Sequence, residues 1–263
     1  MRALALGLLL ASALPSAAHA EDRDFCANRP GRGTPACTLA PGDVMLEVGA
    51  AEFDHSADAL SVTDTLTLMD SLLRVGVTAS TELQVGLGGY QRSRSRDRAS
   101  GTRSRSSGIG DTFVALRHGL AGANGPVSIE AFVTLPTGKP PAGADDWGVG
   151  VLVPLSHDLG GGFQLALTPE ADAAVNASGS GRHFAYGGVV GLSHAAGKRL
   201  ALGSEFAAFE DYDPAGHALD ARVTGTLAWQ VTPKLQLDLE ADVGVSHAAP
   251  KTAFLFGFAR RIP

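Results

Sequence analysis

Long apolar runs, cysteines and aromatic residues are all scarce in this sequence of 263 residues. After the first twenty residues, no segment approaches the roughly 20 consecutive apolar residues that a spanning helix requires. There is no His-x-x-x-His pair and no cysteine cluster, so no metal site is predicted, and no cofactor is implied. The net charge of −6 does not suggest a nucleic-acid partner.

The first twenty residues, MRALALGLLLASALPSAAHA, combine Arg2, an apolar run and the small-x-small sequence Ala18-His19-Ala20. This pattern is typical of a secretory signal peptide, cleaved before Glu21. A membrane anchor is the alternative, but Pro15 and Ser16 interrupt a run that is already short. We therefore expect residues 21–263 to be exported.

The only two cysteines, Cys26 and Cys37, lie in a segment before the first expected strand. In an oxidising compartment, a disulfide closing this short loop is the preferred interpretation. We expect residues 21–42 to form a periplasmic N-terminal segment. The sequence does not decide whether this segment plugs the pore of a barrel.

Apolar and polar residues alternate through most of the chain, as in LQLDLEADVGVS, where leucine, alanine and valine occupy every second position. A period of two is typical of strands with one apolar and one polar face. In the second strand the leucines change phase, which predicts a bulge near Met69-Asp70-Ser71. Twelve strands are expected, near 43–54, 60–79, 81–95, 107–120, 126–137, 146–157, 162–176, 182–194, 199–212, 217–232, 235–247 and 252–262.

The connections between these strands alternate between tight turns such as TPK and longer polar loops such as TGKPPAGADD. A soluble sandwich would bury the leucines, whereas an outer-membrane barrel turns them towards lipid. Alternating turn lengths and twelve strands favour an up-and-down antiparallel transmembrane β-barrel over 43–263, with both termini in the periplasm. Trp147, Phe184 and Tyr186 at one end, and Phe163 and Trp229 at the other, fit interfacial aromatic girdles.

Several short motifs resemble a known family. SGIGDTFVALRHGL contains Gly108-Ile109-Gly110-Asp111, VTLPTGKPP contains Pro136-Thr137-Gly138, and LLRVGVTASTELQVGLGG pairs two strands around a tight turn. These resemble motifs of the outer-membrane transporters named for the MetA pathway of phenol degradation. The resemblance covers most of 43–262 and implies a bacterial outer-membrane barrel that takes up aromatic or other hydrophobic compounds.

Charged residues on the polar faces are expected to line the lumen, where they must pair or be hydrated. A polar wall that filters solutes and a salt-bridged wall that passes little both fit this pattern. The expected pore-lining residues are Arg74, Glu82, Asp111, Arg117, Glu130, Glu170, Asp172, Asp220, Arg222, Asp238, Glu240 and Asp242.

The sequence RSRSRDRASGTRSRSS places arginine at every second position. If the third strand continues beyond the membrane, Tyr90 and the first arginines keep the lumen side of Glu82 and Gln84. They would then form an extracellular ladder that attracts anions or lipopolysaccharide phosphates; a solvated loop without a ligand is the alternative. The expected basic ladder is Arg92, Arg94, Arg96, Arg98, Arg103 and Arg105.

The preferred function is an outer-membrane channel or transporter for small, hydrophobic or aromatic molecules, in contact with outer-membrane lipid and lipopolysaccharide. One alternative is a structural or lipopolysaccharide-binding barrel without transport. A barrel lipase is a third option, because His157, His194 and His247 each follow a serine. However, no Gly-x-Ser-x-Gly motif occurs, so no catalytic residue is predicted.

Overall fold

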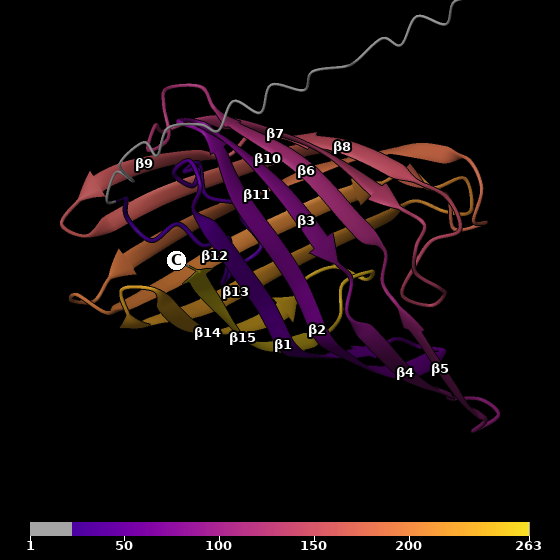
Figure 1. Ribbon diagram of the computed structural model, residues 1–263. Coiled ribbons are helices and arrows are strands. Elements are labelled where there is room, and N and C mark those ends of the chain that lie inside the picture. The colour runs from indigo at the N-terminus through magenta and orange to yellow at the C-terminus, as the bar shows by residue number, and fades with distance from the viewer. Residues whose placement is uncertain (1–22, 263) are drawn as a thin grey trace, which may run out of the picture.

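The computed structural model describes residues 23–262, which are organised as fifteen strands (Figure 1). The expected signal peptide, residues 1–20, lies outside this range. None of the described residues forms a helix long and apolar enough to cross a membrane. The strands are β1 (Val44–Ala57), β2 (Ser61–Thr78), β3 (Thr81–Leu87), β4 (Tyr90–Asp97), β5 (Arg103–Ile109), β6 (Thr112–Gly119), β7 (Ser128–Leu135), β8 (Gly148–Leu152), β9 (Leu155–Gly160), β10 (Phe163–Val175), β11 (Arg182–Ala195), β12 (Leu200–Asp211), β13 (Ala218–Thr232), β14 (Leu235–Gly244) and β15 (Thr252–Ile262).

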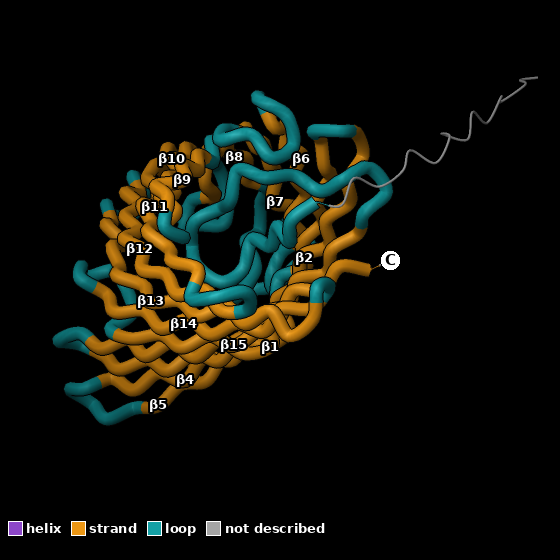
Figure 2. Tube along the Cα trace, turned by 90° about the vertical axis from the view of Figure 1, so that its left-hand side faces the viewer, coloured by secondary structure: helices purple, strands orange, loops and turns teal. Residues whose placement is uncertain are grey.

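The strands close into a single antiparallel barrel, seen nearly end-on in Figure 2. Closure comes from β1, which pairs with β2 on one side and with β15 on the other. Three expected strands are each interrupted once: β3 continues as β4, β5 continues as β6, and β8 continues as β9. Counting each of these as one strand gives twelve, which confirms the prediction. The ladder is closed at the level of β3 and β6, whereas at the loop end β5 pairs with β4 alone among the described strands.

The change of phase expected in the second strand is present at Met69, which has a φ of 60° in the left-handed region, but it is not a bulge, because β2 keeps an unbroken register with β1 and the same register with β3 and β4. Before this point Leu66 faces outward, and after it Leu73 faces outward. In a regular strand, two residues an odd number of positions apart lie on opposite faces. Leu66 and Leu73 are an odd number of positions apart but share a face, so the alternation is interrupted once between them. The change of phase read from the sequence therefore corresponds to a local backbone irregularity.

The distribution of side chains is the reverse of that in a soluble protein. The largest fully buried side chains include Arg74, Arg117, Gln84 and Glu82, whereas leucines, valines and phenylalanines are exposed around the outside. In β14, Asp238 is 1% exposed and the neighbouring Leu239 is 52% exposed. The leucines therefore face outward and the carboxylates face the enclosed interior, as predicted.

The two ends of the barrel differ in their connections. Tight turns join β2 to β3, β9 to β10, β11 to β12 and β13 to β14 at the end where β1 begins and β15 finishes; we call this the terminal end. Longer connections, including 136–147, 176–181, 212–217 and 245–251, lie at the opposite end, which we call the loop end. Before β1, residues 23–43 run inside the barrel as an irregular inner segment (Figure 2).

Candidate functional site: the barrel lumen

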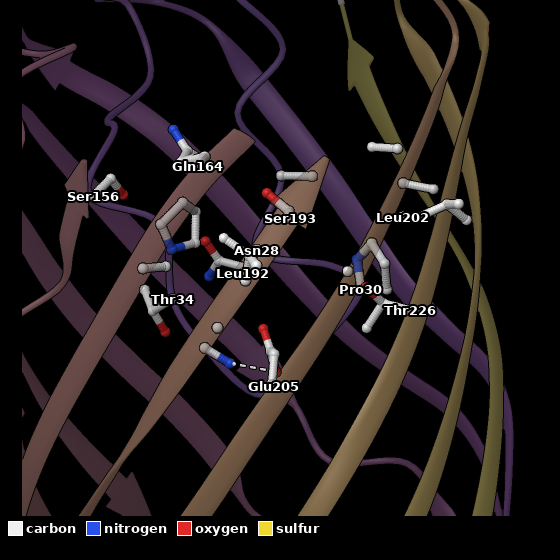
Figure 3. A pocket seen from close by; sticks show the side chains of 18 residues that line it. Asn28, Pro30, Thr34, Ser156, Gln164, Leu192, Ser193, Leu202, Glu205 and Thr226 are labelled. Atoms are coloured by element: carbon white, nitrogen blue, oxygen red, sulfur yellow. Dashed lines mark hydrogen bonds between the residues drawn. The ribbon is translucent and has the colours of Figure 1, made fainter. Parts of the chain in front are cut away.

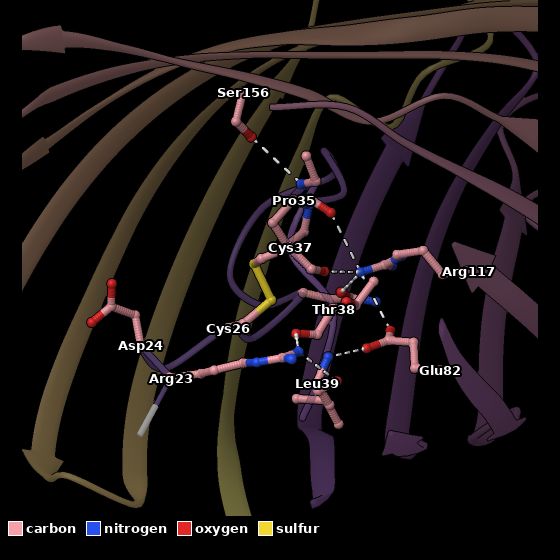
Figure 4. Close-up of a disulfide and its surroundings, with 12 residues drawn as sticks. Arg23, Asp24, Cys26, Pro35, Cys37, Thr38, Leu39, Glu82, Arg117 and Ser156 are labelled. Atoms are coloured by element: carbon pink, nitrogen blue, oxygen red, sulfur yellow. Dashed lines mark hydrogen bonds and ion pairs between the residues drawn. A yellow bond between two sulfur atoms is a disulfide. The ribbon is translucent and has the colours of Figure 1, made fainter. Parts of the chain in front are cut away.

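The inner segment, residues 23–43, occupies the lumen and is closed into a loop by a disulfide between Cys26 and Cys37 (Figure 4). The predicted pairing is therefore present. Ala36, Leu39 and Ala40 of the segment are at most 1% exposed. The sequence did not decide whether the N-terminal segment plugs the barrel; in the structure it fills part of the lumen.

One buried ion-pair network lies between β1, β2, β3, β6 and β7. Arg74 pairs with Glu47 at 2.9 Å and with Glu82 at 2.8 Å. Arg117 Nε donates to Glu130 Oε2 at 2.6 Å and its Nη1 lies 3.5 Å from Glu82. Each charged group in this network has an opposite charge beside it, so the network satisfies the requirement that buried charges be paired.

The same network holds the inner segment by its backbone. Glu47 accepts hydrogen bonds from the backbone N–H groups of Asn28 and Arg29, and Glu82 accepts one from Leu39 N–H at 2.8 Å. Arg74 donates to the Cys26 carbonyl oxygen at 2.6 Å. The wall charges therefore satisfy backbone groups of a segment that has no secondary structure of its own.

A second network lies on the opposite wall, on β12, β13 and β14. Arg29 donates to Asp238 at 2.9 Å, and Arg32 forms an ion pair with Asp242. Glu240 accepts the Gly31 N–H at 2.9 Å. Glu205 of β12 accepts the Arg32 and Gly33 N–H groups. The acidic face of β14 thus binds the cationic turn of the inner segment.

The other expected pore-lining residues form no hydrogen bond or ion pair with the described inner segment, residues 23–43, although Arg222 reaches the second network through Asp242. Arg222 pairs with Asp220 at 2.6 Å and approaches Asp242 at 3.7 Å. Glu170 lines a cavity on the loop-end side of the segment. Asp111 also reaches that cavity, but its carboxylate accepts N–H groups of Gly138 and Ala144 and so fixes the 136–147 loop.

Three cavities follow one another past the inner segment. A terminal cavity of about 460 Å³ includes Ala201, Ala228 and Lys234 in its lining. A middle cavity of about 160 Å³ lies between the inner segment and β10–β13 (Figure 3). A loop-side cavity of about 380 Å³ is lined by residues of β2, β3, β6 and β7 and by the inner segment. Ala201 and Ala228 line both the terminal and middle cavities, whereas Asn28 and Thr34 line both the middle and loop-side cavities.

Sequence reasoning missed several residues that hold the lumen together. Glu47 and Glu205 occupy inward positions of alternating strands, so the same period-two pattern could have identified them. Arg29 and Arg32 lie in the irregular segment between the cysteines, where no periodicity predicts an orientation. Their partners, Asp238 and Asp242, are separated from them by more than 200 residues, which sequence proximity cannot indicate.

The basic ladder does not lie where the sequence predicted it. Arg94 of β4 is opposite Asp64 of β2, and Arg92 is opposite Leu66, which faces outward. Residues directly opposite in an antiparallel pair share a face, so these arginines lie on the outer face and not on the lumen side of Glu82. The chain changes phase at the Gly88-Gly89 interruption between β3 and β4.

Glycine is required at this interruption because two backbones approach closely. A Cβ added at Gly88 would lie 2.5 Å from Cα of Gly110, which separates β5 from β6. This crossing of two glycine positions allows β4 and β5 to leave the barrel wall as a separate hairpin. Arg98 lies in the turn of that hairpin, where its N–H donates to the Leu60 carbonyl.

A polar clasp joins two long connections at the loop end. His183 Nε2 lies 2.5 Å from Asp211, and its Nδ1 lies 2.9 Å from Asn176 and 3.4 Å from Asp213. His183, Asp211 and Asp213 are close enough to hold a metal ion. However, Asp213 already accepts the N–H groups of Ala177 and Ala215, so the cluster is accounted for by hydrogen bonds within the protein.

This clasp should be pH-dependent. The pKa of Asp213 lies below its ordinary value of 3.8 because the Ala177 and Ala215 N–H groups donate to the carboxylate. A lowered pKa stabilises the clasp above pH 3.8, and this contribution is lost as the pH falls through the lowered value. Asp213→Asn, which offers one acceptor oxygen for two donors, should expose residues 176–181 to proteolysis even at neutral pH. Equal cleavage of both proteins at neutral pH would contradict this assignment.

The comparisons with known proteins agree with the barrel. The chain resembles the COG4313 outer membrane channel from Pseudomonas putida F1 at 17% identity, with a TM-score of 0.66, covering 89% of this chain and 99% of that one. It also resembles the translocator domain of the autotransporter NalP from Neisseria meningitidis (14%, TM-score 0.53, 85% and 89%) and the β domain of the Bordetella autotransporter BrkA (11%, 0.55, 85% and 100%). A search of the curated proteins finds no match.

At these identities the structural likeness shows the fold, which is that of outer-membrane barrels and supports an outer-membrane location. These relatives are described as a channel, the translocator domain of one autotransporter and the β domain of another, and none is described as an enzyme. The sequence itself matches the family described as "Putative MetA-pathway of phenol degradation" over residues 27–262. Because this match spans nearly the whole described structure, the chain belongs to the MetA-pathway of phenol degradation family.

Proposed function

We propose that this protein is a passive outer-membrane channel for small organic molecules, with its termini in the periplasm. Apart from residues 120–127, the connections at the terminal end are short turns, and apart from residues 58–60 those at the loop end are longer. This supports the orientation, because bacterial barrels have short periplasmic turns and longer extracellular loops. Half of the expected pore-lining charges would then act as a scaffold, since they bind the inner segment directly: Arg74, Glu82, Arg117, Asp238, Glu240 and Asp242.

The observation that carries the proposal is the chain of cavities past the inner segment. The terminal and middle cavities share Ala201 and Ala228, and the middle and loop-side cavities share Asn28 and Thr34. These shared linings support a route from the terminal cavity, through the middle cavity beside β10–β13, to the loop-side cavity. The inner segment narrows this route without filling it.

The middle cavity sets the size and chemistry of the solute. Its volume of about 160 Å³ is close to the ~150 Å³ of an apolar cavity that accommodates one benzene molecule. The lining combines apolar groups such as Pro30, Ala166 and Ala228 with the polar side chains of Gln164 and Thr226. A ring carrying one or two hydroxyl groups matches both features, in agreement with the phenol-degradation description of the family.

The route is tested by filling it. Ala201 faces the lumen and lines two cavities, so Ala201→Trp should reduce single-channel current in planar bilayers by roughly fivefold or more, because the close-packed wall leaves the indole only the cavity to occupy. Phenol added to the wild-type protein should also lower the ion current by occupying the middle cavity.

Val190→Trp is the matched control, because Val190 is exposed on the outer face of β11 and lines none of these cavities. Its current should equal that of the wild type. Absence of current in the wild type would overturn the channel proposal. Unchanged current in Ala201→Trp would overturn this route.

A further inference from the structure

The hairpin of β4 and β5 carries a cluster of arginines on a single face. The hairpin projects beyond the barrel at the loop end, paired along β2 (Figure 1). Arg94 lies directly opposite Arg105, and Arg96 directly opposite Arg103. Because opposite residues share a face, these four side chains and Arg92 form one cationic surface, which we call the arginine face.

The arginine face continues the outer apolar surface of the barrel. Leu66 of β2 lies opposite Arg92 on one side and opposite Phe53 of β1 on the other. Tyr90 and Ile109, which are opposite each other at the base of the hairpin, are 46% and 59% exposed. Moving away from the barrel, the outer face therefore changes from aliphatic and aromatic side chains to guanidinium groups.

The other face of the hairpin has a different chemistry. Thr63 donates to Ser95 at 3.0 Å, and the hydroxyls of Thr65 and Ser93 lie 2.9 Å apart. These neutral hydroxyls face the side of the lumen mouth. The alternation of arginine and serine in the sequence therefore separates charge from hydroxyl groups across the two faces.

Within residues 23–262, no carboxylate forms an ion pair with the five guanidinium groups of the arginine face. Asp64, which lies opposite Arg94, is engaged with His55 at 2.7 Å. Like charges directly opposite on a sheet are destabilising. An external anion that neutralises several guanidinium groups would remove this repulsion.

We propose that the arginine face binds the phosphate groups of lipopolysaccharide in the outer leaflet. Arginine matches phosphate through bidentate, charge-assisted hydrogen bonds. The tyrosine and apolar side chains at the base of the hairpin place these arginines at headgroup level, next to the acyl chains. The inference rests on the orientation in the proposed function but not on transport.

The test uses the whole protein in phosphatidylcholine nanodiscs with lipid A that carries both phosphates. The wild type should bind it at least about tenfold more tightly than lipid A stripped of phosphate, because each basic residue near an anionic headgroup contributes favourably. Arg94→Ser/Arg105→Ser should lose most of this preference. Replacing the same pair with lysine should restore part of it, since lysine keeps the charge without the planar fork.

Lys139→Ser/Lys251→Ser is the control, because it removes the same charge from exposed positions in other connections of the loop end. It should leave the preference for phosphorylated lipid A unchanged. Equal affinity of the wild type for both forms of lipid A would overturn the proposal. So would an equal loss of the preference in Lys139→Ser/Lys251→Ser and in Arg94→Ser/Arg105→Ser. Current is measured separately in bilayers without lipopolysaccharide, so a failed channel and a failed lipid site give different results.

Discussion

Replacing Arg117 with alanine is expected to destabilise the protein by about 3–5 kcal/mol, the range for breaking a buried ion pair by removing one partner. Arg117 and Glu82 are fully buried, and Glu130 is 3% exposed. The variant leaves both carboxylates without this neighbouring charge in a closed interior. It also removes the hydrogen bonds that Arg117 donates to the Pro35 and Cys37 carbonyl oxygens of the inner segment. The free energy of unfolding, measured in detergent with denaturant, checks the prediction.

Two further variants identify the cause of this loss. Arg222→Ala should be less harmful, because its partner Asp220 has a side chain that is 36% exposed and can be hydrated. Combining Arg117→Ala with Glu130→Ala should cost less than the sum of the single changes, since the second removes a charge stranded by the first. Additive effects would show that the two groups do not stabilise each other.

The strands of the barrel were predictable because each residue's face depends on its immediate neighbours. In β14, apolar and polar side chains alternate from Leu235 to Asp242, and the lumen side follows from that period alone. The interrupted strands were still recognised because β3 with β4, and β8 with β9, continue in the same direction. Local patterning therefore determines the strand count and, within each uninterrupted strand, which residues face outward.

The prediction that the arginines of β4 lie on the lumen side was wrong for a physical reason that can be traced to the preceding strand, β2. Ser71 pairs with Leu87 and Leu68 pairs with Tyr90, so the register between β2 and its partner strand is the same on both sides of Met69. A change of phase in β2 without a register shift must reverse the faces of its partner strand as well. The change of phase near Met69 was predicted, whereas the resulting outward position of Arg92 was not.

The inner segment was not predictable from periodicity, although a count of the lumen charges could have indicated that further cations were needed. The twelve expected lumen residues contain nine acids and only three arginines, an imbalance that a closed interior does not tolerate without hydration or further cations. Arg29 and Arg32 supply part of the missing charge. The segment has no regular structure, so the positions of these two arginines become clear only from the balance of acidic and basic side chains in the folded lumen.

Removing residues 23–40, so that the mature chain begins just before β1, is expected to raise single-channel conductance several-fold. The barrel closes through β1, β2 and β15 without these residues, whereas the segment occupies much of the lumen. The conducted current should also shift towards cations, because Arg29 and Arg32 are lost while Asp238 and Asp242 remain. Conductance and reversal potential in planar bilayers with unequal salt check both effects.

Two variants distinguish the contribution of the disulfide from that of the ion pairs in holding the inner segment inside the lumen. Cys26→Ser/Cys37→Ser should change conductance little, because the hydrogen bonds to Glu47, Glu82 and Glu205 remain. A variant in which Arg29 and Arg32 are both alanine keeps the disulfide but loses two ion pairs, so its current should fluctuate between the wild-type and the truncated levels. Wild-type conductance in the truncated protein would contradict the role of the segment, because the lumen would then be limited elsewhere along the wall.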